Sequence, residues 1–195
     1  MSRTLLGCLA LALIALPTRT QAQNRWRVET RAGAAFTTQN LADASLDPGF
    51  GFEATVAYGF MPQVSAYAGW DWYHFAASEG SFAGANGDID ETGYAFGLRF
   101  EQPLGETSPV ALRLRAGGTY NHIELEDESG TTIGDSGHGF GWEAGADLGI
   151  TLGNHWELSP GVRYRSLSPD LDFTGVGTSG TLEYVALEIG ASRSF

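Results

Sequence analysis

The sequence predicts an all-β fold, an eight-stranded antiparallel up-and-down transmembrane β-barrel. Three observations lead to this prediction. The carboxyl-terminal stretch 184–195 alternates apolar and polar residues and ends on Phe195, an aromatic that suits a strand ending in a lipid interface. Seven earlier segments alternate in the same way. The connections between these segments are long and short in turn, as in barrels with long loops on one side of a membrane and short turns on the other.

The first 22 residues are predicted to be a cleaved secretory signal peptide, which leaves one barrel domain over residues 23–195. Arg3 supplies the positive charge, residues 5–16 form the apolar run, and small residues follow Pro17 at the cleavage positions. The run is too short to cross a bilayer as a helix. The only cysteine, Cys8, lies in this segment, so the predicted mature chain contains no disulfide.

The first four predicted strands each have one apolar and one polar face. Segment 25–36 places charges of both signs on its polar face, which fits a barrel lumen. Segment 49–60 shows the clearest alternation, with an aromatic or aliphatic residue at every even position. Segment 64–74 follows a tight turn and carries two tryptophans on its apolar face, and segment 92–102 alternates aromatic residues with small or charged ones.

The remaining strands before the last one continue the pattern. Segment 110–121 sets leucine and valine against two arginines, and segment 139–152 sets aromatic and aliphatic residues against two acids. Segment 155–166 contains Pro160, which predicts a β-bulge because a closed barrel has no free edge to accommodate a missing N–H group.

Aromatic residues of the apolar faces gather at two heights, as expected at the two interfaces of a bilayer. One group comprises Trp26, Phe60, Phe100, Trp156 and Phe195, and the other comprises Phe36, Phe50, Trp72, Tyr94, Tyr120, Phe140 and Tyr164. Ten strand residues tilted by about 40° rise about 26 Å, which matches the apolar band of such barrels.

The polar faces point into the predicted lumen and carry charges that nearly balance. They comprise Arg27, Glu29, Arg31, Glu53, Asp71, Arg99, Glu101, Arg113, Arg115, Glu143, Asp147, Glu157, Arg163, Arg165 and Glu188. An eight-stranded barrel is just wide enough for side chains to fill its interior. We therefore expect a paired network rather than an open channel, and the planar guanidinium of arginine suits such pairing with carboxylates.

The overall charge excludes other classes. Removal of residues 1–22 would leave 9 arginines and no lysine against 23 acidic residues, a net charge of −14. Nucleic-acid binding needs a basic face and is not expected. No apolar stretch after the signal peptide is long enough for a transmembrane helix. A soluble lipocalin-like barrel would turn its apolar face inward, which the charged inner faces and Phe195 argue against.

The sequence resembles the small OmpA/OmpX-type outer-membrane barrels, known as porin-family or outer membrane β-barrel domain proteins. The most specific match is the carboxyl-terminal assembly signal of that class, here Glu188, Gly190 and Phe195, with Arg193 as a departure at the penultimate hydrophobic position. The resemblance implies insertion by the outer-membrane assembly machinery into the cell outer membrane of a Gram-negative bacterium. It does not imply a single function, because such folds carry many.

We expect a monomeric, non-enzymatic protein with a structural or surface-interaction role and no cofactor. A small-solute pore is the first alternative, and a lipid A-modifying barrel enzyme is the second. The deacylase type of that enzyme needs a His-x-Ser pair, and none of the four histidines is followed by serine at that spacing.

The predicted extracellular loops, 75–91 and 122–138 among them, are acidic. Their carboxylates include Asp88, Asp90, Glu91, Glu124, Glu126, Asp127 and Glu128. These groups are candidates for divalent cations that bridge to lipopolysaccharide phosphates, or for a basic partner; otherwise they form a solvated loop surface.

Overall fold

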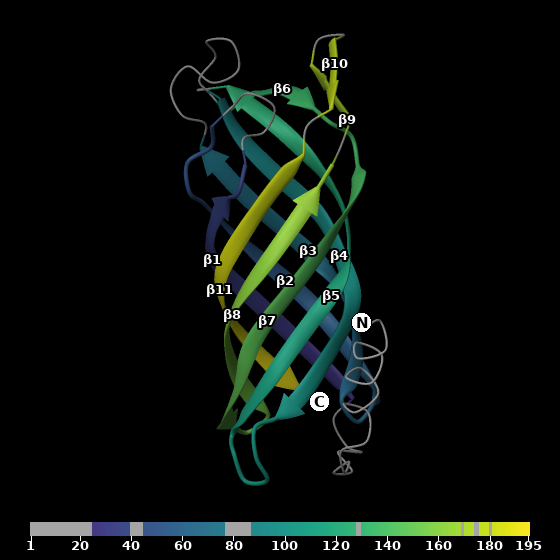
Figure 1. The fold of residues 1–195 in the computed structure, drawn as a ribbon, viewed down its shortest axis with the longest axis vertical. Helices are drawn as coiled ribbons and strands as arrows, with labels where there is room; N and C mark the ends of the chain where they lie inside the picture. The colour runs from purple at the N-terminus through teal and green to yellow at the C-terminus, as the bar shows by residue number, and fades with distance from the viewer. Residues whose placement is uncertain are drawn as a thin grey trace, which may run out of the picture.

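The computed structural model is a closed antiparallel barrel of eight strands, as the sequence predicts (Figure 1). It describes residues 25–39, 45–76, 87–127, 130–168, 170–173, 176–179 and 181–195. The predicted signal peptide lies outside these ranges. Each wall strand pairs with its neighbours in the chain, and β1 (Trp26–Thr37) pairs with β11 (Leu182–Ser194) to close the wall.

Between these two strands, the wall continues through six others in chain order. They are β2 (Gly49–Met61), β3 (Val64–Ala76), β4 (Gly87–Pro103), β5 (Val110–Asp127), β7 (Gly139–Gly153) and β8 (Trp156–Leu167). Three short strands, β6 (Thr132–Asp135), β9 (Asp170–Phe173) and β10 (Val176–Ser179), lie together at one end of the barrel (Figure 1). We call this the long-loop end, and the opposite end, where the carboxyl terminus lies, the short-turn end.

Burial follows the predicted alternation. Along β2, the odd-numbered residues from Gly49 to Ala57 are buried in the lumen, while Phe50, Phe52 and Val56 are exposed on the outer wall. An apolar exterior around a polar interior is the inverse of a soluble barrel, and it is what a strand needs when one face meets lipid. Within the described ranges, no helical segment has the length and apolar character needed to cross a membrane.

The strands at the long-loop end run further than the sequence analysis predicts. β4 begins at Gly87 rather than residue 92, and β5 continues to Asp127 rather than ending at 121. The predicted loops 75–91 and 122–138 were therefore too long. The alternation continues through these segments, with Ile89 and Ile123 buried, and their pairing across β4 and β5 extends the wall.

The predicted bulge at Pro160 is wrong. β8 pairs with β11 in unbroken register, with Pro160 opposite Ile189. On the other side, β8 keeps the same register with β7 from Gly161–Asp147 to Leu158–Ile150. The two positions between these pairs have no registered partner, so the absent N–H group of proline interrupts the ladder without an inserted residue. The register shift between β7 and β8 lies further along, between Thr151 and Gly153.

Candidate functional site

The fifteen predicted lumen charges all lie on inward-facing positions of the wall. Twelve are buried, and the remaining three, Arg27, Glu101 and Glu157, are partly exposed at the short-turn end. Because the side chains come from strands around the whole wall, most of their ion pairs cross the lumen rather than join neighbouring strands.

The centre of the network contains two glutamates and three arginines. Arg115 on β5 reaches across to Glu53 on β2, with Nη1 2.9 Å from Oε1 and Nη2 3.3 Å from Oε2. Arg163 also pairs with Glu53, and Arg165 Nη2 lies 3.1 Å from it. Glu143 on β7 accepts from the same three arginines, at 2.6, 3.2 and 2.9 Å. Each carboxylate is thus shared by several guanidinium groups, which offsets the cost of burying it.

Above this centre, the network continues toward the long-loop end. Arg165 makes a bidentate pair with Asp71, at 2.7 and 3.0 Å, and Asn121 donates to the same carboxylate at 2.7 Å. Asn121 also donates to Glu91 at 2.8 Å. Glu91 is fully buried in the lumen, so its prediction as an acid of the extracellular loop was wrong. Among the described residues, the network therefore contains nine acids and seven arginines.

Below the centre, a second set of ion pairs joins the walls toward the short-turn end. Glu29 on β1 pairs with Arg99 on β4 and with Arg31, both at 2.5 Å. Arg31 also reaches Asp147 on β7 at 2.9 Å. Nearest the opening, Arg27 lies 3.0 Å from Glu101. The described part of the lumen is thus crossed by ion pairs at successive heights.

Two tyrosines also join the network, although they are not among the site residues predicted from the sequence. The Tyr67 hydroxyl donates to Glu143 at 2.6 Å, and the Arg115 guanidinium lies 4.3 Å from the Tyr67 ring centroid. Tyr73 donates to Glu188, and Arg163 donates to Tyr73 at 3.3 Å. These tyrosines share the inward phase of the charged residues, and that phase is the signal that could have identified them.

A pair of glycines makes room for Tyr67. Gly97 on β4 and Gly117 on β5 lie opposite each other, and a Cβ atom on Gly117 would lie 2.5 Å from the Tyr67 hydroxyl and would clash with the Phe96 carbonyl oxygen. The tyrosine therefore needs glycine at this point of the wall.

Gly117→Ala is expected to lower the free energy of unfolding by about 1–3 kcal/mol, because the added methyl group displaces Tyr67 from Glu143 and Arg115. Gly59→Ala is the matched control, since the nearest atom to its added Cβ is 3.7 Å away; it should change stability by less than about 0.5 kcal/mol. Urea unfolding in detergent micelles measures both. Equal midpoints for the two variants would contradict this role of Gly117.

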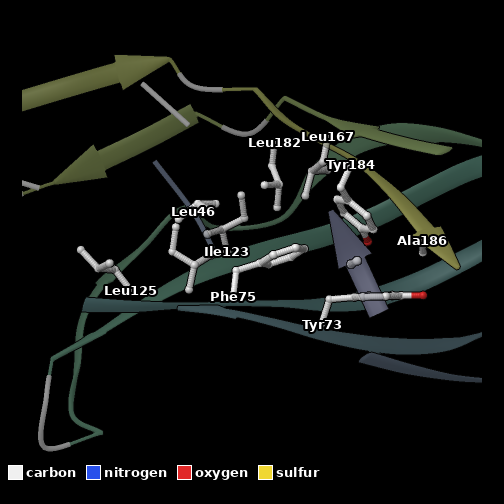
Figure 2. Packing of buried hydrophobic residues seen from close by; sticks show 11 residues of the cluster. Leu46, Tyr73, Phe75, Ile123, Leu125, Leu167, Leu182, Tyr184 and Ala186 are labelled. Atoms are coloured by element: carbon white, nitrogen blue, oxygen red, sulfur yellow. The ribbon is translucent and has the colours of Figure 1, made fainter. Parts of the chain in front are cut away.

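A cluster of buried apolar side chains, here called the apolar plug, packs together at the long-loop end of the barrel (Figure 2). It consists of Ala35, Leu46, Tyr73, Phe75, Ile89, Ile123, Leu125, Leu167, Leu182, Tyr184 and Ala186, all buried. The Phe75 and Tyr184 rings meet edge to face with centroids 5.2 Å apart. Arg165 donates to the Tyr184 hydroxyl at 3.4 Å, so the plug is in direct contact with the charged network.

Two residues of the predicted assembly signal, Glu188 and Gly190, lie on the inner face of β11, and the third, Phe195, follows its end. Glu188 is buried in the lumen, and a Cβ atom on Gly190 would meet Glu29 and Arg31, so its position is crowded from inside. Phe195 is 55% exposed on the outside. The Arg193 guanidinium, the departure from the motif, lies 5.1 Å from the Phe195 ring centroid, within the range of a cation–π contact.

The described residues form one group that could hold a metal ion. His122, Glu124 and Asp135 offer ligand atoms that all lie within 4.8 Å of one another. The group is on the outer wall, apart from the lumen network.

Together, the closed wall, apolar exterior and charged interior define a small transmembrane β-barrel. The chain matches the family described as outer membrane protein beta-barrel domain over residues 7–195, and it belongs to this family. No curated protein sequence matches the chain.

Several solved structures share the fold at low sequence identity. Neisserial surface protein A matches with a TM-score of 0.64 and 16% identity over 87% of this chain and 97% of that chain. OprG from Pseudomonas aeruginosa matches with a TM-score of 0.54 and 14% identity over 91% and 99%. Ail, the attachment invasion locus protein of Yersinia pestis, in complex with the heparin analogue sucrose octasulfate, matches with a TM-score of 0.50 and 15% identity over 89% and 99%.

Proposed function

We propose that this protein is a non-conducting, non-enzymatic structural barrel that acts through its outer surface at the long-loop end. The single observation that supports this most strongly is the filling of the lumen. Ion pairs such as Arg115–Glu53 and Arg165–Asp71 cross it, and the apolar plug lies above them. A solute pore would need a continuous polar path, and the plug interrupts such a path.

The surface role is supported by the charge of the extended strands. Asp88, Asp90, Glu124 and Glu126 alternate with buried residues on β4 and β5 and therefore face outward. Asp90 and Glu124 are direct neighbours across these strands. In this family the long-loop end is the extracellular one. A negatively charged outer band favours a basic partner, or divalent cations shared with lipopolysaccharide phosphates.

The negative charge of the outer band argues against a ligand of the kind found in one of the structural neighbours. The Ail structure contains a heparin analogue, which is a polyanion. A polyanion would be repelled by the outward carboxylates of this chain. We therefore propose a partner of opposite sign. We also propose that the barrel is monomeric and inserted by the outer-membrane assembly machinery through Glu188 and Gly190 of β11 and the adjoining Phe195.

Single-channel recording tests the proposal. The refolded protein in a planar bilayer is expected to give no steady conductance steps, because the network and the plug fill the lumen. Heat-modifiable gel mobility verifies folding, and a general porin in the same bilayer verifies detection. Reproducible steps of one size would overturn the proposal and support the small-solute pore.

A further inference from the structure

The outer wall near the long-loop end carries a cluster of histidine and carboxylate side chains that the lumen does not use. His122 and Glu124 on β5 face outward, because the residues that alternate with them, Asn121 and Ile123, are buried inside. β6 lies beside this part of β5 and places Asp135 directly opposite Glu124. The carboxylates and the imidazole thus come from two paired strands, which fix their spacing.

The residues between β6 and β7 orient the Asp135 carboxylate. Ser136 exchanges two bonds of 2.9 Å with the backbone of Ile123: its N–H donates to the carbonyl oxygen, and its hydroxyl accepts from the N–H. Gly137 then adopts a φ of +64°, which favours glycine. Its N–H donates to Asp135 Oδ1 at 2.7 Å. This bond holds the Asp135 carboxylate through one of its two oxygens.

The same break places His138 against His122. His122 Nδ1 lies 3.3 Å from His138 Nε2, and His122 Nε2 lies 3.0 Å from Glu124 Oε1. The two nitrogens of His122 therefore face different partners. Histidines that bind metals usually donate their other ring N–H to an acceptor, which fixes the tautomer and the ring orientation. His138 is placed to be that acceptor.

We propose that His122 Nε2, Glu124 and Asp135 bind one divalent first-row transition-metal ion of the Zn²⁺ type, with His138 as a positioning residue. Imidazole with carboxylates suits this class, whereas Ca²⁺ and Mg²⁺ take oxygen ligands. Three protein ligands leave a coordination position for water or another small ligand. The site does not depend on whether the lumen conducts.

His74 on β3 offers a matched comparison, two strands away from β5. It also lies between two outward carboxylates, with Nδ1 2.6 Å from Asp90 and Nε2 3.8 Å from Asp88. Here the two acids face opposite nitrogens of one ring, so a single ion cannot use both together with the histidine. A surface that bound metal merely through histidines near acids would treat His74 and His122 alike.

Isothermal titration of ZnCl₂ into untagged, chelator-treated protein in a neutral detergent tests the site. The wild-type protein is expected to bind one ion, and both His122→Ala and Glu124→Gln should weaken binding by about 100-fold or more, beyond the 10–100-fold range of outer-shell losses. His138→Ala should weaken it about 10-fold, and His138→Gln, whose amide oxygen can accept the same bond, should recover part of that loss. His74→Ala should bind as the wild type does.

Three results would overturn the proposal: no saturable Zn²⁺ binding by the wild-type protein, an equal loss in His74→Ala and His122→Ala, or displacement of Zn²⁺ by an equal concentration of Ca²⁺. Heat-modifiable mobility shows that each variant is folded. The substitutions lie on the outer wall, so the lumen network remains intact in all of them.

Discussion

Glu53→Ala is expected to lower the free energy of unfolding by about 3–5 kcal/mol, the range for breaking a buried ion pair by removing one partner. Glu53 is 1% exposed and accepts from Arg115, Arg163 and Arg165. Without it, these three buried guanidinium groups lose a shared counter-charge, and they cannot turn to water without leaving the lumen. Urea unfolding in detergent micelles, followed by tryptophan fluorescence, measures the loss.

Two further variants separate charge from packing. Glu53→Gln keeps the shape of the side chain, so the decrease in its free energy of unfolding reports the missing charge. Glu106→Ala removes an exposed acid from the connection between β4 and β5, and its midpoint should match that of the wild type within about 0.5 kcal/mol. If Glu53→Ala unfolded at the same urea concentration as Glu106→Ala, the ion pairs would not stabilise the barrel.

A double variant tests whether Glu53 acts through Arg115. Arg115→Ala alone should also destabilise the barrel, because it removes a cation that both Glu53 and Glu143 use. Combined with Glu53→Ala, it should cost less than the sum of the two single losses, by about 0.5–3 kcal/mol, since the removed groups no longer leave each other unpaired. Additive losses would mean that Glu53 and Arg115 are not energetically coupled.

The wall and the inward phase could be predicted from the sequence because both depend only on period-2 alternation. Once the phase of each strand is known, the inward charges follow, and the structure places Arg99 and Glu143 where the alternation requires. The pairing between distant strands could not be predicted in this way. Glu29 meets Arg99 across the lumen because of the stagger between strands, which single-strand patterns do not contain.

The errors in the loops have a common physical cause. Acidic and glycine-rich segments favour a loop prediction, yet Ile89, Glu91 and Leu125 keep the inward phase within them. Burial of these side chains in the plug and the network outweighs the polar character of their outward neighbours. Pro160 shows the opposite error: its missing N–H group predicts a bulge, yet β8 pairs with β11 in unbroken register through this residue.

Phe75→Ala is expected to cost about 3–5 kcal/mol, the range for removing a fully buried phenylalanine. Phe75 is 0% exposed, contacts Tyr184, and packs where Gly49 has no side chain. Phe50→Ala is the matched control, since Phe50 is 57% exposed on the outer wall and loses its ring contacts with Trp72 and His74; it should cost about 1 kcal/mol.

Conductance of Phe75→Ala distinguishes the roles of the plug and the ion pairs. Removal of the ring opens a cavity in the apolar layer, but Arg165 still pairs with Asp71 beneath it. We therefore expect the variant to be less stable and still non-conducting. Steady steps in Phe75→Ala but not in the wild type would show that the plug alone seals the lumen. Equal stability losses for Phe75→Ala and Phe50→Ala would show that the buried layer contributes no more than the lipid-facing one.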